Sequence, residues 1–310
     1  MKKIFILFLP LGLFVAPVAV IAKHYAADTR FPNVYYNVKK FPKGLFGKDG
    51  KTLVPTKQLS RVLLSWDLNG VIFRREYSIT ANLYQIAVTE KKSWGYAIKM
   101  LYNFGKLYRY KLQLKRKGDP RGWVWDAVFR SLETSVEGKE FAALLRRFSQ
   151  QANVLDYHMI ALMQEISRNG HHNVVLSNMG EGLAAVNVSF LQTQLEKGNL
   201  SAERREATQF AINFLTNKGR NVIASAENNW LHKPMRESYQ TCIAKNMRSH
   251  DSHHSESLTI FFDDKFSNIT AAVEDGLFDI AVYYKSSGDK GCKKLRKFLG
   301  QISDGKIVAL

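Results

Sequence analysis

Residues 61 to 73 read Arg-Val-Leu-Leu-Ser-Trp-Asp-Leu-Asn-Gly-Val-Ile-Phe, and the fold is predicted from this stretch outward. A short β-prone apolar run at residues 62 to 64 leads to the carboxylate of Asp67, and Gly70 then lets the backbone turn sharply. The pattern predicts a buried strand with an acid at its carboxyl end. In open α/β sheets ligands bind at this end, because the connecting loops converge there. Strands that end in Asp are common, so a catalytic interpretation depends on the rest of the chain.

Three later stretches repeat this design, in which a β-prone apolar run is followed by polar residues. The polar residues that follow these runs are, in chain order, Ser177 with Asn178, then Lys233, then the adjacent acids Asp263 and Asp264. An Asp, a Ser, a Lys and a pair of Asp, each after a predicted strand and in that order, form a specific pattern.

In these motifs the sequence resembles the haloacid-dehalogenase-like (HAD) hydrolase superfamily, most of whose members are magnesium-dependent phosphatases. The resemblance covers residues 61 to 284. It implies an α/β fold with a doubly wound, mainly parallel, Rossmann-like sheet. It also implies a role for each motif residue: Asp67 as nucleophile, Ser177 as phosphate-binding hydroxyl, Lys233 as charge-neutralising lysine, and Asp263 and Asp264 as metal-holding acids.

The resemblance further implies a Mg²⁺ ion as cofactor. Two adjacent carboxylates repel each other unless a cation holds them, which favours a hard divalent ion with oxygen ligands. By analogy with the family, the ion is expected to contact Asp67 and the backbone carbonyl of Asn69. Asp264 is expected to be a direct ligand, and Asp263 to act directly or through water. Asn178 is expected to position the substrate or the nucleophile.

Asn69 departs from the family pattern. Phosphatases of this family usually carry a second Asp two residues after the nucleophile, which protonates the leaving alcohol and later activates water. An amide forms hydrogen bonds but cannot exchange a proton in this way, and general acid–base assistance is typically worth about 100- to 10,000-fold in rate. The prediction is therefore a slow phosphoric monoester hydrolase that acts through an aspartyl-phosphate on Asp67.

Two alternatives stay open. The first is a catalytically impaired protein of the same fold with a binding or structural role, since a fold alone does not guarantee chemistry. The second is a hydrolase that acts on carbon, as in the dehalogenase branch of the family. Asp263 and Asp264 argue against the second, because displacement at carbon needs no magnesium.

The chain divides into parts by composition and periodicity. The predicted parts are a leader at residues 1 to 22, an extended lead-in at 23 to 60, a core at 61 to 73 and 152 to 310, and a helical insertion at 74 to 151. The insertion resembles the cap that many family members fold over the active site, where it excludes water and contacts the substrate. A packed helical bundle without lid motion is the alternative.

The insertion is rich in cationic side chains, with aromatic residues between them. The cationic residues are Lys106, Arg109, Lys111, Lys115, Arg116, Lys117 and Arg121. Such a surface suits a small phosphorylated or otherwise anionic substrate, or an anionic membrane surface beside an amino-terminal anchor. A solvated helix face is the plainer alternative. The net charge of the chain, +18, favours anionic partners in general, but no nucleic-acid motif is present.

The first 22 residues combine two lysines, an apolar run and small residues near their end. This pattern predicts a secretory signal, and an uncleaved membrane anchor is the alternative. Either one predicts an exported protein, periplasmic, secreted or held at the membrane. Cys242 and Cys292 are the only cysteines, and they permit either one disulfide or two buried thiols.

Overall fold

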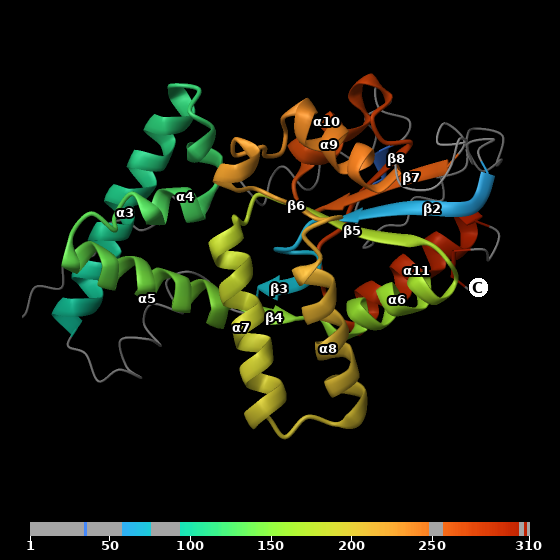
Figure 1. Cartoon of the computed structure of the whole chain (residues 1–310), viewed down its shortest axis with the longest axis horizontal. Coiled ribbons are helices and arrows are strands. Elements are labelled where there is room, and N and C mark those ends of the chain that lie inside the picture. Colours follow the sequence, from blue (N-terminus) through green and yellow to red (C-terminus); the bar gives the residue numbers. More distant parts are fainter. Residues whose placement is uncertain (1–33, 36–57, 76–93, 248–256, 304–306, 309–310) are drawn as a thin grey trace, which may run out of the picture. The chain divides into compact units, whose positions relative to one another are not determined.

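Strand β2 (Gln58–Trp66), which contains the start of the deciding stretch, lies inside a six-stranded sheet. The computed structural model describes residues 34–35, 58–75, 94–247, 257–303 and 307–308, so the predicted leader lies outside the described residues. The strand order is β1-β8-β7-β2-β5-β6, and all the strand pairs of this sheet are parallel. Helices flank the sheet, so the predicted α/β class with a parallel sheet is confirmed (Figure 1).

The other strands of the sheet are short. They are β1 (Val34–Tyr35), β5 (His172–Ser177), β6 (Val222–Ile223), β7 (Ser257–Asp263) and β8 (Ile280–Tyr283). β1, which belongs to the predicted lead-in, pairs with β8 at one edge of the sheet. The described part of the lead-in is therefore built into the core.

The core helices follow the strands in chain order. They are α6 (Tyr157–Arg168), α7 (Glu181–Lys197), α8 (Ala202–Thr216), α9 (Arg236–Met247), α10 (Phe266–Val273) and α11 (Asp289–Ser303). Figure 1 shows α9 and α10 on one face of the sheet and α6 and α11 on the other, which is the doubly wound arrangement. Short 3-10 turns occur at η3 (Pro120–Trp123), η4 (Ala226–Asn228) and η6 (Glu274–Gly276).

Residues 62 to 66 of β2 are buried on both faces, as a near-continuous apolar run predicts for a central parallel strand. Val62, Leu64 and Trp66 are all fully buried. The Trp66 ring stacks on Phe262 of β7 with ring centroids 4.0 Å apart, and its indole N–H donates to Asn173 Oδ1 at 2.8 Å. The strand that leads to Asp67 is thus fixed by packing on both neighbours.

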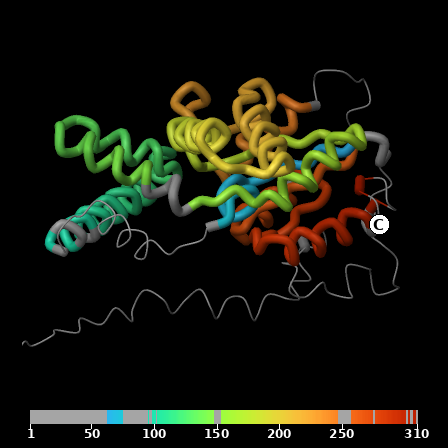
Figure 2. Tube along the Cα trace, turned by 90° about the horizontal axis from the view of Figure 1, so that it is seen from below, coloured from blue at the N-terminus to red at the C-terminus, as the bar shows by residue number. Residues whose placement is uncertain are grey.

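The path of the chain makes the carboxyl end of β2 a topological switch point. After β2 the chain passes to β5 and β6 on one side, and then to β7 and β8 on the other. Figure 2 shows the blue trace of β2 between the green and the red parts of the chain. Helices on opposite faces leave a crevice at such a point, and ligands of doubly wound proteins bind there.

The helical insertion begins shortly after Asp67. The backbone N–H groups of Ile72 and Phe73 both donate to the Leu68 carbonyl, which closes one tight turn. β3 (Phe73–Arg75) then pairs in an antiparallel manner with β4 (Asn153–Leu155), so the two ends of the insertion are held side by side. Between them lie α3 (Trp94–Arg116), α4 (Trp125–Arg130) and α5 (Val136–Ala152). The described part of the insertion is helical, and its boundaries as a domain stay a prediction.

A buried carboxylate joins the insertion to the core. Asp126 of α4 accepts a hydrogen bond from the N–H of Gly182, in the first turn of α7, at 3.2 Å. This places a negative charge at the positive end of a helix dipole. Gly180 has a φ of +90°, and a Cβ atom there would lie 2.4 Å from the Asp126 Cβ. The close approach of α4 to α7 therefore requires glycine at this position.

Cys242 and Cys292 are both buried and form no disulfide. Of the two possibilities that the sequence permits, the structure therefore has two buried thiols. Among the residues that the structure describes, no helix has the length and apolar content needed to cross a bilayer. The predicted leader is not part of that search, since it precedes the described residues.

Candidate functional site

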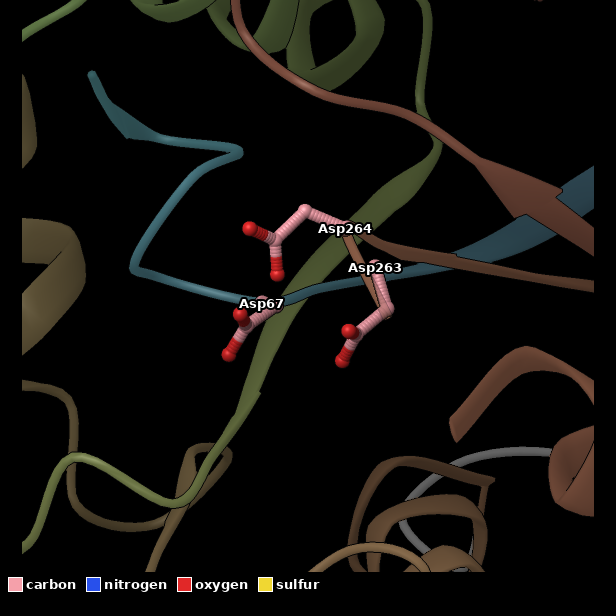
Figure 3. A group of neighbouring side chains, drawn as sticks. All are labelled: Asp67, Asp263 and Asp264. Carbon is pink, nitrogen blue, oxygen red and sulfur yellow. The ribbon is translucent and has the colours of Figure 1, made fainter. Parts of the chain in front are cut away.

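Strand register brings the predicted nucleophile beside the two adjacent acids. Trp66 pairs with Phe262, and the N–H of Asp67 donates to the Phe262 carbonyl at 2.9 Å. Asp67 therefore lies next to Asp263 and Asp264. One carboxylate oxygen from each of the three lies within 4.8 Å of the other two (Figure 3). This cluster sits at the switch point of the sheet.

Lys233 supplies the positive charge of the cluster. Its side chain is buried, and its Nζ donates to Asp67 Oδ1 at 2.8 Å and to Asp263 Oδ2 at 2.5 Å. Burial on its own would lower the pKa of Lys233, but the charges of Asp263 and Asp67 outweigh burial, and the pKa is raised. The lysine is therefore a fixed cation between two carboxylates.

Asn178 links the loop after β5 to the loop that carries Lys233. The backbone N–H of Lys233 donates to Asn178 Oδ1, and the Asn178 amide donates back to the Lys233 carbonyl, each at 2.7 Å. This pair of bonds orients Lys233 toward the carboxylates. The predicted role of Asn178 in substrate binding stays a prediction, while the structure gives the amide this bracing contact.

Ser177 ends β5 at the same edge of the sheet. Trp66 pairs with Val175, so Ser177 lies beyond the end of β2, on the side of the cluster away from β7. The Ser177 hydroxyl oxygen accepts the N–H of Met179 at 3.2 Å. Because that bond uses a lone pair, the hydroxyl proton is left to donate to a ligand.

The two adjacent acids have different surroundings. Both oxygens of Asp263 accept hydrogen bonds. Its Oδ1 accepts the N–H of Lys265 at 2.8 Å, and its Oδ2 accepts Lys233 and the Asn268 amide, the latter at 2.9 Å. Asp264 Oδ1, in contrast, is buried and has no hydrogen-bond partner. A buried oxygen without a partner is destabilising, and a bound cation removes that penalty.

The residues around Asp264 fit a hard divalent cation. Asn69 Oδ1 is also buried without a hydrogen bond. Gly70 has a φ of +92°, and a Cβ atom there would lie 2.4 Å from Asp264 Oδ2, so glycine leaves the space that this carboxylate occupies. Carboxylate, amide and carbonyl oxygens are the ligands that Mg²⁺ takes in proteins. Of the two adjacent acids, Asp264 has the oxygen available for a metal.

Asp264 also has a strongly perturbed pKa. Burial, followed by the charges of Asp67 and Asp263, raises the pKa of its carboxyl from 3.8 to about 7. Keeping this group ionised at neutral pH is therefore unfavourable in the metal-free protein. A divalent cation favours the ionised form, so metal binding and proton release are coupled here.

Asp264→Asn is expected to stabilise the metal-free protein at about pH 8. Because the folded pKa of Asp264 lies above its unfolded value, its contribution to stability is largest at low pH and is lost as the pH rises to about 7. The loss is on the order of 4 kcal/mol. Urea unfolding in EDTA measures it, and the advantage of the variant should shrink as the pH is lowered. Added Mg²⁺ should stabilise only the wild type. A variant less stable than wild type at about pH 8 would contradict this assignment.

Several contacts of the site could not be predicted from the sequence. Asn268, which holds Asp263, and His232, which precedes Lys233, become recognisable only once the loops are in place. His232 is buried, and its ring stacks on Trp123 of the insertion with ring centroids 5.3 Å apart. The helical insertion thus reaches the loop that carries Lys233.

No family model matches this sequence, and no curated protein sequence matches it. A comparison with solved structures finds matches that include the crystal structure of a HAD family enzyme from Bacteroides thetaiotaomicron. The two chains are 16% identical, the match covers 74% of this chain and 95% of that one, and the TM-score is 0.37. At this TM-score the similarity carries no argument about the chain. Fold and site define a doubly wound α/β protein with three carboxylates and a buried lysine at its switch point.

Proposed function

We propose that this chain is a magnesium-dependent hydrolase of phosphate monoesters in which Asp67 accepts the phosphoryl group. The observation that carries the proposal is the convergence of Asp67, Asp263 and Asp264 within 4.8 Å, with the Lys233 Nζ bonded to two of them. A cluster of acids with one buried cation suits the binding of a divalent metal and an anion together. Phosphoryl transfer requires this combination, because its catalysis is largely positioning and charge stabilisation.

The residues that would hold Mg²⁺ are Asp67, Asp264 and the backbone carbonyl of Asn69, with Asp263 fixed behind them by Lys233. When bound, the ion supplies Lewis-acid stabilisation of the charge on the phosphoryl oxygens. Lys233 adds a positive charge that does not depend on the metal. The Ser177 hydroxyl would donate its proton to a phosphoryl oxygen and so orient the group toward Asp67.

In the proposed reaction a carboxylate oxygen of Asp67 attacks phosphorus, and the bond from phosphorus to the ester oxygen breaks. The leaving oxygen takes its proton from water, because the Asn69 amide cannot act as a general acid. A second water then attacks the phosphorus of the aspartyl-phosphate, which releases inorganic phosphate and restores the Asp67 carboxylate. Asn69 cannot accept the proton of that water, so both steps lack general acid–base assistance from this position.

A phosphate-binding protein without turnover is the second candidate, and Asn69 is the observation that favours it. Its amide oxygen is buried beside the cluster without a hydrogen bond. Compared with the usual Asp, an amide at this position can still form a hydrogen bond to an anion or to a metal-bound water, but it cannot transfer a proton. Binding of Mg²⁺ and phosphate without hydrolysis of any ester would support this candidate.

Turnover of p-nitrophenyl phosphate with and without Mg²⁺ tests the proposal. We expect slow, Mg²⁺-dependent release of nitrophenol by the wild type, and Asp67→Asn should reduce it to background because an amide is a far poorer nucleophile. Asp289→Asn, at a half-exposed acid in the first turn of α11, is the matched control and should keep the activity. Full Mg²⁺-dependent turnover by Asp67→Asn would overturn the assignment of the nucleophile.

Export of the chain is also proposed, on the basis of the sequence of residues 1 to 22 alone. An anionic membrane surface remains a proposed partner of the cationic insertion. Both concern where the protein acts, and neither affects the chemistry at Asp67.

A further inference from the structure

Lys111 of α3 is a buried lysine without an acidic partner. Its side chain is 6% exposed, its Nζ donates to the Gly122 carbonyl at 2.6 Å, and it lies 4.7 Å from the centroid of the Trp125 ring. α3 contains no acidic residue, and among the described residues no Asp or Glu forms an ion pair with Lys111. Lysine is almost never buried this deeply unless it is paired. A carbonyl and an aromatic ring leave much of the charge uncompensated.

Other cations surround Lys111 instead of acids. Burial, then the charge of Lys115, then that of Lys265, lowers the pKa of Lys111 to about 7. Lys115 also belongs to α3, while Lys265 belongs to the core. Burial and the charge of Lys265 lower the pKa of Lys115 as well. Lys111 is thus a buried ammonium group without an acidic partner, and the charges of Lys115 and Lys265 act on it. An anion bound at this place would be stabilised by all three positive charges.

One of the three cations belongs to a loop that carries the site, and its charge acts on the two lysines of the insertion. Lys265 directly follows Asp264, and His232 directly precedes Lys233. Burial is the largest cause that lowers the pKa of His232, and the charges of Lys115 and Lys111 lower it further. The hydrogen bond to the Trp230 carbonyl opposes them, but the net effect is a lowered pKa. The cationic side chains of the insertion are therefore electrostatic neighbours of both loops.

Trp123 connects the insertion to His232. Its ring stacks on His232 with ring centroids 5.3 Å apart, and the Lys115 Nζ lies 3.6 Å from the centroid of the Trp123 ring. The ring therefore holds Lys115 near the loop that carries Lys233.

We propose that Lys111, Lys115 and Lys265 form a second anion-binding subsite next to the Asp67 centre, so that the substrate carries a phosphate or carboxylate besides the phosphoryl group that is transferred. This inference rests on the proposed phosphatase function for the identity of the first group. It assigns the substrate to phosphate monoesters with two anionic groups, such as phosphorylated acids or bisphosphates. A charge-assisted contact of this kind is worth about 10- to 100-fold in affinity.

Matched pairs of substrates test the subsite. Phosphoglycerate differs from glycerol phosphate by a carboxylate in place of a hydroxymethyl group, and sugar bisphosphates differ from sugar monophosphates by one phosphate. We expect kcat/KM of the wild type to be about 10-fold or more higher for the member with two anions in at least one pair. Which kind of pair shows the preference identifies the second group as carboxylate or phosphate.

Variants separate the subsite from a general effect of charge. Lys115→Gln and Lys265→Gln should each lower the kcat/KM ratio within the preferred pair at least about 5-fold. Lys117→Gln, at an exposed lysine just after α3, is the control and should leave the ratio unchanged. Lys111 is not replaced, because loss of its contacts could unfold the insertion. A ratio near one in every pair, or a preference that survives both replacements, would overturn the proposal.

A binding measurement keeps the two proposals apart. If the wild type hydrolyses no ester, the phosphatase proposal fails, and the subsite is tested by the thermal stabilisation that each member of a pair produces. Greater stabilisation by the doubly anionic member, lost in Lys115→Gln, would support the subsite even then. Equal stabilisation by both members would refute it.

Discussion

Replacing Lys233 with Met will destabilise the metal-free protein by about 3 to 5 kcal/mol and abolish turnover of phosphate esters. Removal of the ammonium group leaves the buried carboxylates of Asp67 and Asp263 without their shared cation. Breaking a buried ion pair on one side is far more destabilising than losing a surface pair, because the remaining charge has no water around it. Phosphoryl transfer is lost because the oxygens of the transferred group lose a fixed positive charge.

Urea unfolding in EDTA measures the first effect, and p-nitrophenyl phosphate turnover measures the second. Lys245→Met, at an exposed lysine of α9, is the matched control and should change stability by less than about 0.5 kcal/mol. The double variant Lys233→Met with Asp263→Asn should be less destabilised than the sum of the single variants, because the second change removes a stranded charge. Additive effects in this cycle would mean that Lys233 and Asp263 are not coupled as the structure indicates.

Asn69→Asp will raise Mg²⁺-dependent phosphatase activity by about 100- to 10,000-fold. The carboxyl group can protonate the leaving oxygen in the first step and take a proton from the attacking water in the second, which an amide cannot do. The added acid increases the negative charge of the cluster, so the gain should require Mg²⁺. The backbone carbonyl that is proposed as a metal ligand is the same in both proteins.

Asn69→Ala is the control for this gain, since it removes the amide without adding an acid, and it should not accelerate turnover. Esters with good leaving groups should benefit less from Asn69→Asp than esters of ordinary alcohols, because they need less protonation of the leaving oxygen. No rise in a folded variant that still binds Mg²⁺ would show that the missing acid is not what limits the rate.

The motifs and their order in the chain predict the parallel sheet and the proximity of its three acidic residues, Asp67, Asp263 and Asp264. The family resemblance, together with the position of each motif after a predicted strand, predicts that Asp67, Lys233 and Asp263 lie close together, and the hydrogen bonds of Lys233 join all three. The buried strand that leads to Asp67 was also predicted, from its apolar run. These features depend on local sequence and on strand order alone.

The remaining features depend on contacts between distant segments. Nothing in the sequence shows that Asn178 braces the Lys233 backbone, or that Asp126 caps α7, because each bond joins segments more than 50 residues apart. The cations of the insertion were visible as a cluster, but whether they face solvent or the site depends on how α3 packs. The family resemblance predicted that Asp264 is the direct metal ligand, but the physical difference between the two acids lies in their hydrogen bonds. Asp263 accepts three of them, whereas Asp264 Oδ1 accepts none.

The phosphoryl acceptor itself can be identified by mass spectrometry of protein quenched in acid during turnover of a phosphate ester with Mg²⁺. With p-nitrophenyl phosphate the leaving oxygen needs little protonation, whereas the attack of water still lacks a base at Asn69. The aspartyl-phosphate should therefore accumulate with this ester, and the mass of one phosphoryl group should appear on the peptide that contains Asp67. The adduct should be removed by hydroxylamine and absent from Asp67→Asn. A phosphoryl group on any other residue, or steady turnover with no adduct on Asp67, would contradict the account.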